Sequence, residues 1–94
     1  MTKADLVEQV AEAIGPGITK KDCALVVDGF LNAVKLALSK GENIEIRGFG
    51  TFKVKQRKAR MARNPRTGEA VPVPERRVPV FKVSKMLKDR VALS

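Results

Sequence analysis

The sequence has no histidine, tryptophan or tyrosine, and one cysteine among its 94 residues. Without histidine neither a Ser–His nor a Cys–His catalytic pair can form, and no Walker-type phosphate loop is present, which argues against an enzyme. A single cysteine, Cys23, excludes a disulfide framework within the chain, and its apolar neighbours predict a buried side chain. The acidic residues cap helices or are scattered, so we expect no metal site, no cofactor and no small-molecule substrate.

Long apolar runs are also missing. No segment approaches the ~20 apolar residues that cross a bilayer, and the opening MTKADLVEQV lacks the apolar centre of a signal peptide. We therefore expect a cytoplasmic protein that binds no membrane. The four phenylalanines are the only aromatic residues. Because so short a chain buries little surface alone, a partner subunit is expected to add burial.

The net charge of +9 is concentrated in one part of the chain. Residues 1–40 carry five bases and five acids, and residues 41–52 have a net charge of −1. Residues 53–77 carry nine bases against two acids, a net +7, and residues 78–94 add +3. Positive charge gathered in this way is typical of a surface that binds a polyanion.

Two helices are predicted in the first 40 residues. TKAD (2–5) and TKKD (19–22) each place a threonine three residues before an acid, as in a capping box. Gly-Pro-Gly at 15–17 ends the first helix, and the second runs to about Ser39. The first has a narrow apolar stripe, whereas the second is apolar over a wide arc that needs cover on two sides. A dimer interface is the favoured second cover, and a monomer that wraps this helix is the alternative.

After Gly41 the apolar period changes to two. Residues 42–47 and 52–56 alternate around Gly48-Phe49-Gly50, which predicts a β-hairpin. A return strand is expected over about 70–82. The C-terminal segment is a predicted short helix with Ser84 as N-cap, and its expected inward residues are Met86, Leu87 and Val91.

Residues 53–77 form a predicted two-stranded arm. From 53 to 66 it carries seven bases and no acid: Lys53, Lys55, Arg57, Lys58, Arg60, Arg63 and Arg66. The stretch from Lys53 to Asn64 gives a length of about 40 Å at ~3.3 Å per residue. Because an isolated hairpin is marginal in water, we expect the free arm to be mobile until a partner orders it.

The arm is predicted to fold back about Arg66. The expected pairs are Met61 with Val71, Ala59 with Val73, and Arg57 with Glu75. Pro72 and Pro74 are two apart, so both would lack an N–H on the outer edge, where proline is tolerated. Pro79 has the opposite parity, which predicts a bulge or a break in pairing between Pro74 and Pro79.

Duplex DNA is the favoured polyanion. Single-strand binders use aromatic stacking platforms, and no phenylalanine lies between residues 53 and 80. Membrane binding would need a basic amphipathic helix, which the chain lacks. Charge alone does not choose between the grooves. Pro65 at the tip indicates a wedge that enters between base pairs and bends the duplex.

The chain resembles the bacterial HU and integration host factor family. The motif is RNPRTGE (63–69), preceded by Phe-Gly-x-Phe (49–52) and followed by Val-Pro-x-Phe-Lys (78–82) and Leu-Lys (87–88). The resemblance covers essentially the whole chain. It implies an α+β fold in an intertwined dimer: two N-terminal helices, a three-stranded antiparallel sheet extended into a long β-ribbon arm, and a short C-terminal helix.

The resemblance also implies one domain over residues 1–94. Residues 1–52 would form the dimerisation body and sheet base, 53–77 the DNA-binding arm, and 78–94 the return strand and last helix. Phe49, Phe52 and Phe81 would belong to the core.

The resemblance gives roles to individual residues as well. Pro65 would intercalate, and Arg60, Arg63, Asn64 and Arg66 would follow the groove and its phosphates. Lys3, Lys82 and Lys85 would clamp flanking phosphates, helped by helix N-termini. Arg76 and Arg77, on the return side, complete the predicted DNA-binding set.

Two departures from the family pattern stand out. The family usually has Pro-Gly where this chain has Val83-Ser84, and the Gly-Pro-Gly loop is longer than in compact HU proteins. IEIRGFG (44–50) resembles the integration host factor beta type, in which the arginine matching Arg47 can approach bases, whereas ERRV (75–78) is closer to the alpha type.

The leading hypothesis is a non-enzymatic, dimeric protein that bends duplex DNA through the minor groove with low sequence specificity in the bacterial nucleoid. A homodimer is expected, and a heterodimer stays open. The alternatives are a sequence-selective integration host factor-like subunit and, from another class, a basic RNA-associated structural protein.

Overall fold

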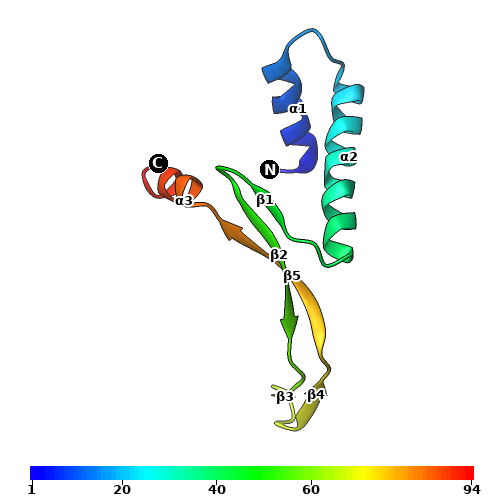
Figure 1. Ribbon diagram of the computed structural model, residues 1–94, viewed down its shortest axis with the longest axis vertical. Helices are drawn as coiled ribbons and strands as arrows, with labels where there is room; N and C mark the ends of the chain where they lie inside the picture. The colour runs from blue at the N-terminus through cyan, green and yellow to red at the C-terminus, as the bar shows by residue number, and fades with distance from the viewer. The chain divides into compact units, whose positions relative to one another are not determined.

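The computed structural model describes all of residues 1–94 and divides into two compact units, residues 1–36 and 37–94. The elements in chain order are α1 (Lys3–Ile14), α2 (Lys20–Ser39), β1 (Ile44–Ile46), β2 (Gly50–Arg57), β3 (Arg60–Arg63), β4 (Ala70–Val73), β5 (Arg76–Val83) and α3 (Lys85–Ala92) (Figure 1). The predicted α+β class and the predicted order of elements are confirmed. No helix is both long enough and apolar enough to span a bilayer.

Both predicted N-caps are present. The Thr2 hydroxyl accepts a hydrogen bond from the Asp5 N–H, and the Asp5 carboxylate accepts one from the Thr2 N–H at 2.8 Å, which completes a capping box. The Thr19 hydroxyl accepts a hydrogen bond from the Asp22 N–H at 3.1 Å, just before α2. Gly15, with a φ of 90°, ends α1 in a conformation that a side chain would strain.

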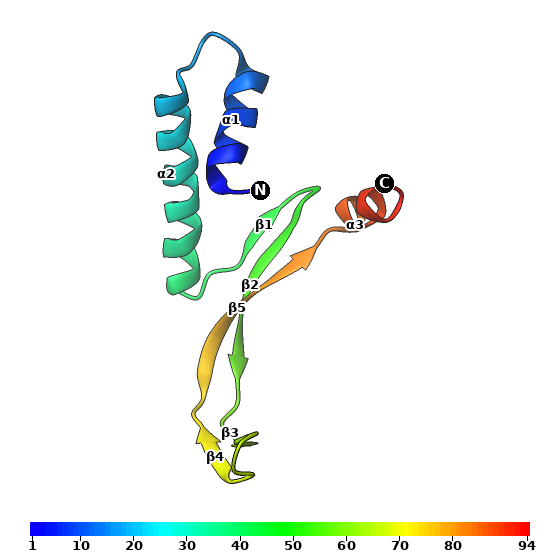
Figure 2. The same cartoon turned by 180° about the vertical axis from the view of Figure 1, so that it is seen from behind.

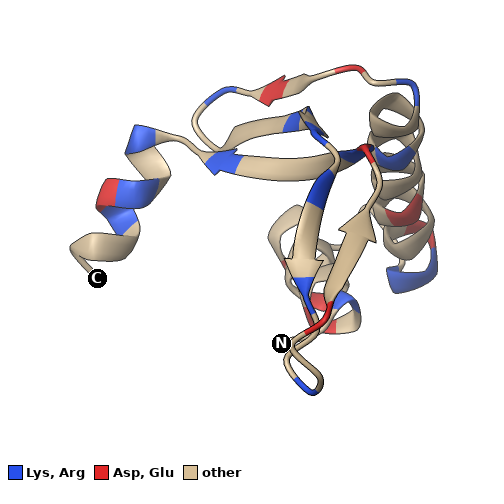
Figure 3. Cartoon of the chain, turned by 90° about the horizontal axis from the view of Figure 1, so that it is seen from below, with Lys and Arg blue, Asp and Glu red and all other residues tan.

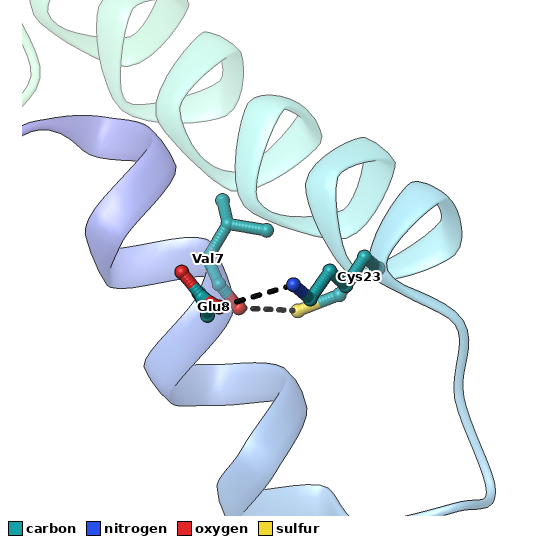
Figure 4. A network of polar contacts seen from close by, with 4 residues as sticks. Val7, Glu8 and Cys23 are labelled. Carbon is teal, nitrogen blue, oxygen red and sulfur yellow. Dashed lines mark hydrogen bonds and ion pairs between the residues drawn. The ribbon is translucent and has the colours of Figure 1, made fainter.

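The first unit is a helical hairpin in which α1 and α2 run antiparallel side by side (Figure 2). Cys23 is 1% exposed, and its thiol donates to the Val7 carbonyl oxygen at 3.6 Å (Figure 4). Lys20 forms an ion pair with Glu8 at 3.1 Å between the same two helices. The predicted burial of Cys23 is confirmed, and the sulfur acts as a small core residue.

The chain buries few apolar side chains by itself. Val7 and Cys23 are the only buried hydrophobic residues, and no polar side chain is buried. The exposed apolar residues of the first unit are Met1, Leu6, Val10, Ile14, Leu25, Val26, Phe30, Leu31 and Leu36. The wide apolar arc predicted for α2 therefore lies open in a single chain.

The second unit contains a three-stranded antiparallel sheet in the order β1-β2-β5. Phe52 of β2 pairs with Phe81 of β5, and their ring centroids lie 4.9 Å apart. Phe49, in the turn before β2, brings its ring centroid to 5.2 Å from that of Phe81. The three rings form a cluster, but the expectation that all of them belong to the core is not met in a single chain, because Phe49 and Phe81 are 45% and 44% exposed.

Helix α3 begins as predicted, since the Ser84 hydroxyl accepts a hydrogen bond from the Leu87 N–H at 3.1 Å. Serine therefore caps this helix at the place where the family resemblance predicts Pro-Gly. The prediction that Met86 and Val91 point inward is wrong for a single chain, because they are 72% and 67% exposed. The second unit offers no surface that covers them.

The predicted register of the arm is wrong by one residue. Met61 pairs with Pro72 and not with Val71, and Arg57 pairs with Arg76 and not with Glu75. The cause is the turn: Gly68 has a φ of 75°, and the Asn64 N–H donates to the Glu69 carbonyl at 2.8 Å. The fold-back is therefore centred between Arg66 and Thr67, and the predicted Arg57–Glu75 pair is replaced by a hydrogen bond from Gln56 to Glu75 at 2.8 Å.

Pairing along the arm is interrupted once, as the prolines predict. The return strand predicted over 70–82 is two strands, β4 and β5, separated by Pro74 and Glu75. The facing strand is interrupted as well, at Lys58 and Ala59. Each strand loses two residues, so the register is the same on both sides of the break, and Pro79 pairs with Val54 inside β5.

Substitution of Gly50 tests the packing of the phenylalanine cluster. A Cβ at Gly50 would lie 2.5 Å from Cζ of Phe81 and 2.6 Å from the carbonyl oxygen of Lys82. We expect Gly50→Ala to lower the free energy of unfolding by about 1–3 kcal/mol, because overpacking displaces the Phe81 ring or the β5 backbone. Urea denaturation at one fixed protein concentration measures the change.

Gly17→Ala is the matched control. A Cβ at Gly17 meets nothing within 4 Å, and Gly17 has no positive φ. Its unfolding free energy should stay within about 0.5 kcal/mol of the unchanged protein. Equal stability of the two variants would contradict the tight packing at Gly50.

Candidate nucleic-acid interface

The two faces of the sheet differ in chemistry because side chains alternate along each strand. Phe52 and Phe81 share one face, together with Val54 and Pro79. The opposite face carries five basic residues of the predicted set, here called the basic face: Lys53, Lys55, Arg57, Arg76 and Lys82. Figure 3 shows basic residues recurring along these strands. The cationic side chains are thus concentrated on one face, where Val78 and Val80 lie between them, while Arg77 alone of the bases lies on the phenylalanine face.

The end of the basic face nearest α3 is an open hollow of about 390 Å³. Its lining includes four predicted DNA-binding residues: Arg47, Lys53, Lys82 and Lys85. Glu45 is the only acidic residue in that lining. The start of α3 brings Lys85 to this hollow. The structure therefore gathers bases that lie far apart in the sequence.

A second hollow, of about 430 Å³, lies at the break in the arm. Its lining is Arg57, Lys58, Ala59, Arg60 and Arg76, with no acidic residue. Arg57 and Arg76 are directly opposite each other, and like charges in that position are unfavourable within a sheet. Phosphate groups placed here would offset the repulsion.

The arm tip is an ordered turn. Asn64 Oδ1 accepts a hydrogen bond from the Arg66 N–H at 2.9 Å, and the Gly68 N–H donates to the Asn64 carbonyl at 2.8 Å. The Arg63 guanidinium donates to the Gly68 carbonyl at 3.2 Å. Pro65 is exposed at the end of this turn. A proline ring carried on a closed loop is suited to act as a wedge.

Two of the predicted DNA-binding residues make contacts within the protein. Arg77 lies on the phenylalanine side of the ribbon, and its guanidinium donates to the Ser39 carbonyl at 3.4 Å, at the C-terminal end of α2. A cation there complements the helix dipole. Lys3, in the first unit, forms an ion pair with Asp28 at 2.7 Å, and both side chains stay about half exposed.

Sequence reasoning overlooked the structural role of the tip residues. Asn64 was predicted only to line the groove, yet its side chain closes the turn. The Thr67 hydroxyl also accepts a hydrogen bond, from the Glu69 N–H at 3.3 Å. Asn-Pro and Thr-Gly are turn-forming pairs, so the signal for both roles is present in the sequence.

Known proteins resemble this chain along its whole length. A family model described as "Bacterial DNA-binding protein" matches residues 1–92. Integration host factor subunit beta of Burkholderia mallei (strain SAVP1) is 50% identical over 91 residues, which cover 97% of this chain and 84% of the relative. The same protein of Burkholderia thailandensis matches equally.

Solved structures agree with these sequence matches. An Anabaena HU–DNA cocrystal structure superposes with a TM-score of 0.88 at 38% identity and covers 100% of both chains. HU from Thermotoga maritima gives a TM-score of 0.67 at 34% identity, over 97% of this chain and 98% of that one. The chain therefore belongs to the bacterial DNA-binding protein family that includes HU and integration host factor, a family of DNA-binding proteins and not of enzymes.

Proposed function

We propose that this protein is a dimeric architectural protein of the bacterial nucleoid, in the cytoplasm, that binds duplex DNA through the minor groove and bends it. The observation that carries the proposal is the continuous run of cationic side chains from the α3 end of the sheet to an arm tip with an exposed proline. Phosphate contacts supply most of the affinity of such a surface. The rigid Pro65 ring supplies the distortion.

The shape of the arm does not choose the groove, because a two-stranded ribbon such as the one beyond the break also fits the wider major groove. The choice of the minor groove comes from the family. Insertion of apolar wedges from the minor groove is the established mode of HU and integration host factor, so this part of the proposal is carried over from the family. Low sequence specificity follows if the cost of deforming DNA selects the site.

A dimer is favoured by the open apolar side chains. Leu25, Val26, Phe30 and Leu36 of α2 are all exposed in a single chain, as are Met86 and Val91 of α3. Each Å² of apolar surface that leaves water stabilises an assembly by about 25 cal/mol. A second copy is the simplest cover, and a different subunit is the alternative.

A sequence-selective subunit is the second candidate function. It is favoured by the 50% identity to integration host factor subunit beta and by the position of Arg47 in the hollow beside the basic face. Arginine can read a base edge as well as a phosphate. Selection from a random-sequence duplex pool distinguishes the two functions, because enrichment of one motif supports the selective subunit.

The assembly prediction is a solution mass of twice the chain mass of 10.3 kDa. Sedimentation equilibrium of the purified protein, with and without a short duplex, measures it. A folded species at the mass of one chain, stable to dilution, would contradict the dimer. A stable fold only after addition of a second type of subunit would favour the heterodimer.

Pro65→Ala tests the wedge. We expect the variant to lose more bending than binding, because the cationic side chains remain while the inserted ring is gone. Fluorescence transfer between the two ends of a labelled duplex reports bending, and a titration of the same duplex reports affinity. Pro16→Ala, in the loop between α1 and α2, is the control and should change neither. Parallel loss of bending and affinity in Pro65→Ala would sink the wedge.

Arg76 and Arg77 form a matched pair for testing which bases bind phosphate. Arg76→Ala removes a base from the basic face, so the slope of log affinity against log salt should fall by about one unit for each phosphate that the variant no longer neutralises. Arg77→Ala removes the hydrogen bond to Ser39 and should leave that slope unchanged. It should instead lower the unfolding free energy by about 0.5–1 kcal/mol. If Arg77→Ala lowered the salt slope and Arg76→Ala lowered only the unfolding free energy, Arg76 would not belong to the interface.

A further inference from the structure

The tip of the arm is organised around one residue. The Asn64 N–H donates a hydrogen bond to the Glu69 carbonyl at 2.8 Å, and the Asn64 carbonyl accepts one from the Gly68 N–H at 2.8 Å. Its side-chain Oδ1 accepts a third, from the Arg66 N–H, at 2.9 Å. No other residue from 64 to 69 makes three hydrogen bonds within the turn. Asn64 is also the one residue in that range that is partly buried, while Pro65, Arg66 and Thr67 are exposed.

The side-chain hydrogen bond encloses Pro65. It joins Asn64 Oδ1 to the N–H two residues later, which is an Asx turn with Pro65 at its centre. The proline ring fixes its own φ and restricts Asn64 to extended conformations. The Asx bond then restrains the remaining backbone freedom between the ring and Arg66. The orientation of the ring is thus set before any partner arrives.

We propose that Asn64 is a positioning residue that holds Pro65 in its wedge orientation through the Oδ1 bond to the Arg66 N–H. The proposal rests on the DNA-bending function above and deepens it. If the proline wedge had to become ordered during binding, the entropy cost of that ordering would lower the affinity for DNA. A preorganised wedge avoids this cost. Asn64 therefore acts on the bend through Pro65, not as a groove contact of its own.

Three substitutions separate positioning from direct contact. Asn64→Asp keeps an acceptor oxygen for the Arg66 N–H but places a negative charge near phosphates. Asn64→Ser keeps a shorter, neutral acceptor that can make the same kind of turn. Asn64→Ala keeps no acceptor. If Asn64 positions Pro65, turn order in the free protein follows the acceptor and not the charge.

The first measurement uses the free, full-length protein. Amide hydrogen exchange by NMR reports the Arg66 N–H directly, and ¹⁵N relaxation reports the order of residues 65–68. We expect Asn64→Ala to speed exchange of the Arg66 amide by about 2- to 10-fold, as for the loss of one intramolecular hydrogen bond. Asn64→Asp should keep the original exchange rate, and Asn64→Ser should lie between the two.

The second measurement uses the doubly labelled duplex. Asn64→Ala should reduce bending in the same direction as Pro65→Ala, and Asn64→Ser should recover part of it. Asn43→Ala is the matched control, because Asn43 Oδ1 makes the same type of bond, to the Val54 N–H at 3.1 Å, outside the tip. It should leave exchange of the Arg66 amide and the bend unchanged.

Either of two results would overturn the role of Asn64. One is an unchanged exchange rate of the Arg66 amide in Asn64→Ala. The other is a loosened tip that bends DNA as before. Failure of the wedge itself is separate, because it appears in Pro65→Ala, either as normal bending or as parallel loss of bending and affinity, whereas the exchange measurement needs no DNA.

Discussion

A single chain leaves most of its large apolar side chains uncovered. One chain buries only Val7 and Cys23 among its hydrophobic residues, while long stretches of α2 and α3 offer apolar side chains to solvent. In the proposed dimer a second subunit would cover these side chains. The ribbon adds little to the apolar core, and residues 53–77 carry charge instead.

Because side chains alternate along a strand, the two faces of the ribbon carry different residues. Along β2 and β5 the phenylalanines take one face, and every lysine and arginine except Arg77 takes the other. The opposed pair of Arg57 and Arg76 is unfavourable for the ribbon alone, and Gln56 rather than an arginine engages the nearby Glu75. In the proposed complex a phosphate backbone would offset this repulsion, and the order of the arm would then depend on DNA binding.

The sequence predicts the features that depend on neighbouring residues and fails for those that depend on contacts with distant residues. Threonine caps, glycine-marked ends and the change of apolar period are settled within a few residues, and each is found where expected. The arm register depends on whether the turn centres on Arg66 or just after it, and a shift of one residue exchanges every facing pair. The inward direction assigned to Met86 and Val91 failed because no part of the chain covers them. The turn-closing hydrogen bond of Asn64 was readable from the Asn-Pro pair, although the surrounding cations favoured a prediction of groove contact.

The symmetrical break in the arm has a consequence for how such ribbons vary in length. Both strands skip two residues, so the outer hairpin keeps its faces aligned with the base on either side of Lys58 and Glu75. Adding one residue to a single strand would turn the outer segment over and exchange its groove-facing and solvent-facing side chains. Longer or shorter arms on this scaffold should therefore arise by matched insertions or deletions of two residues in each strand, so that arm length changes in steps of two residue pairs.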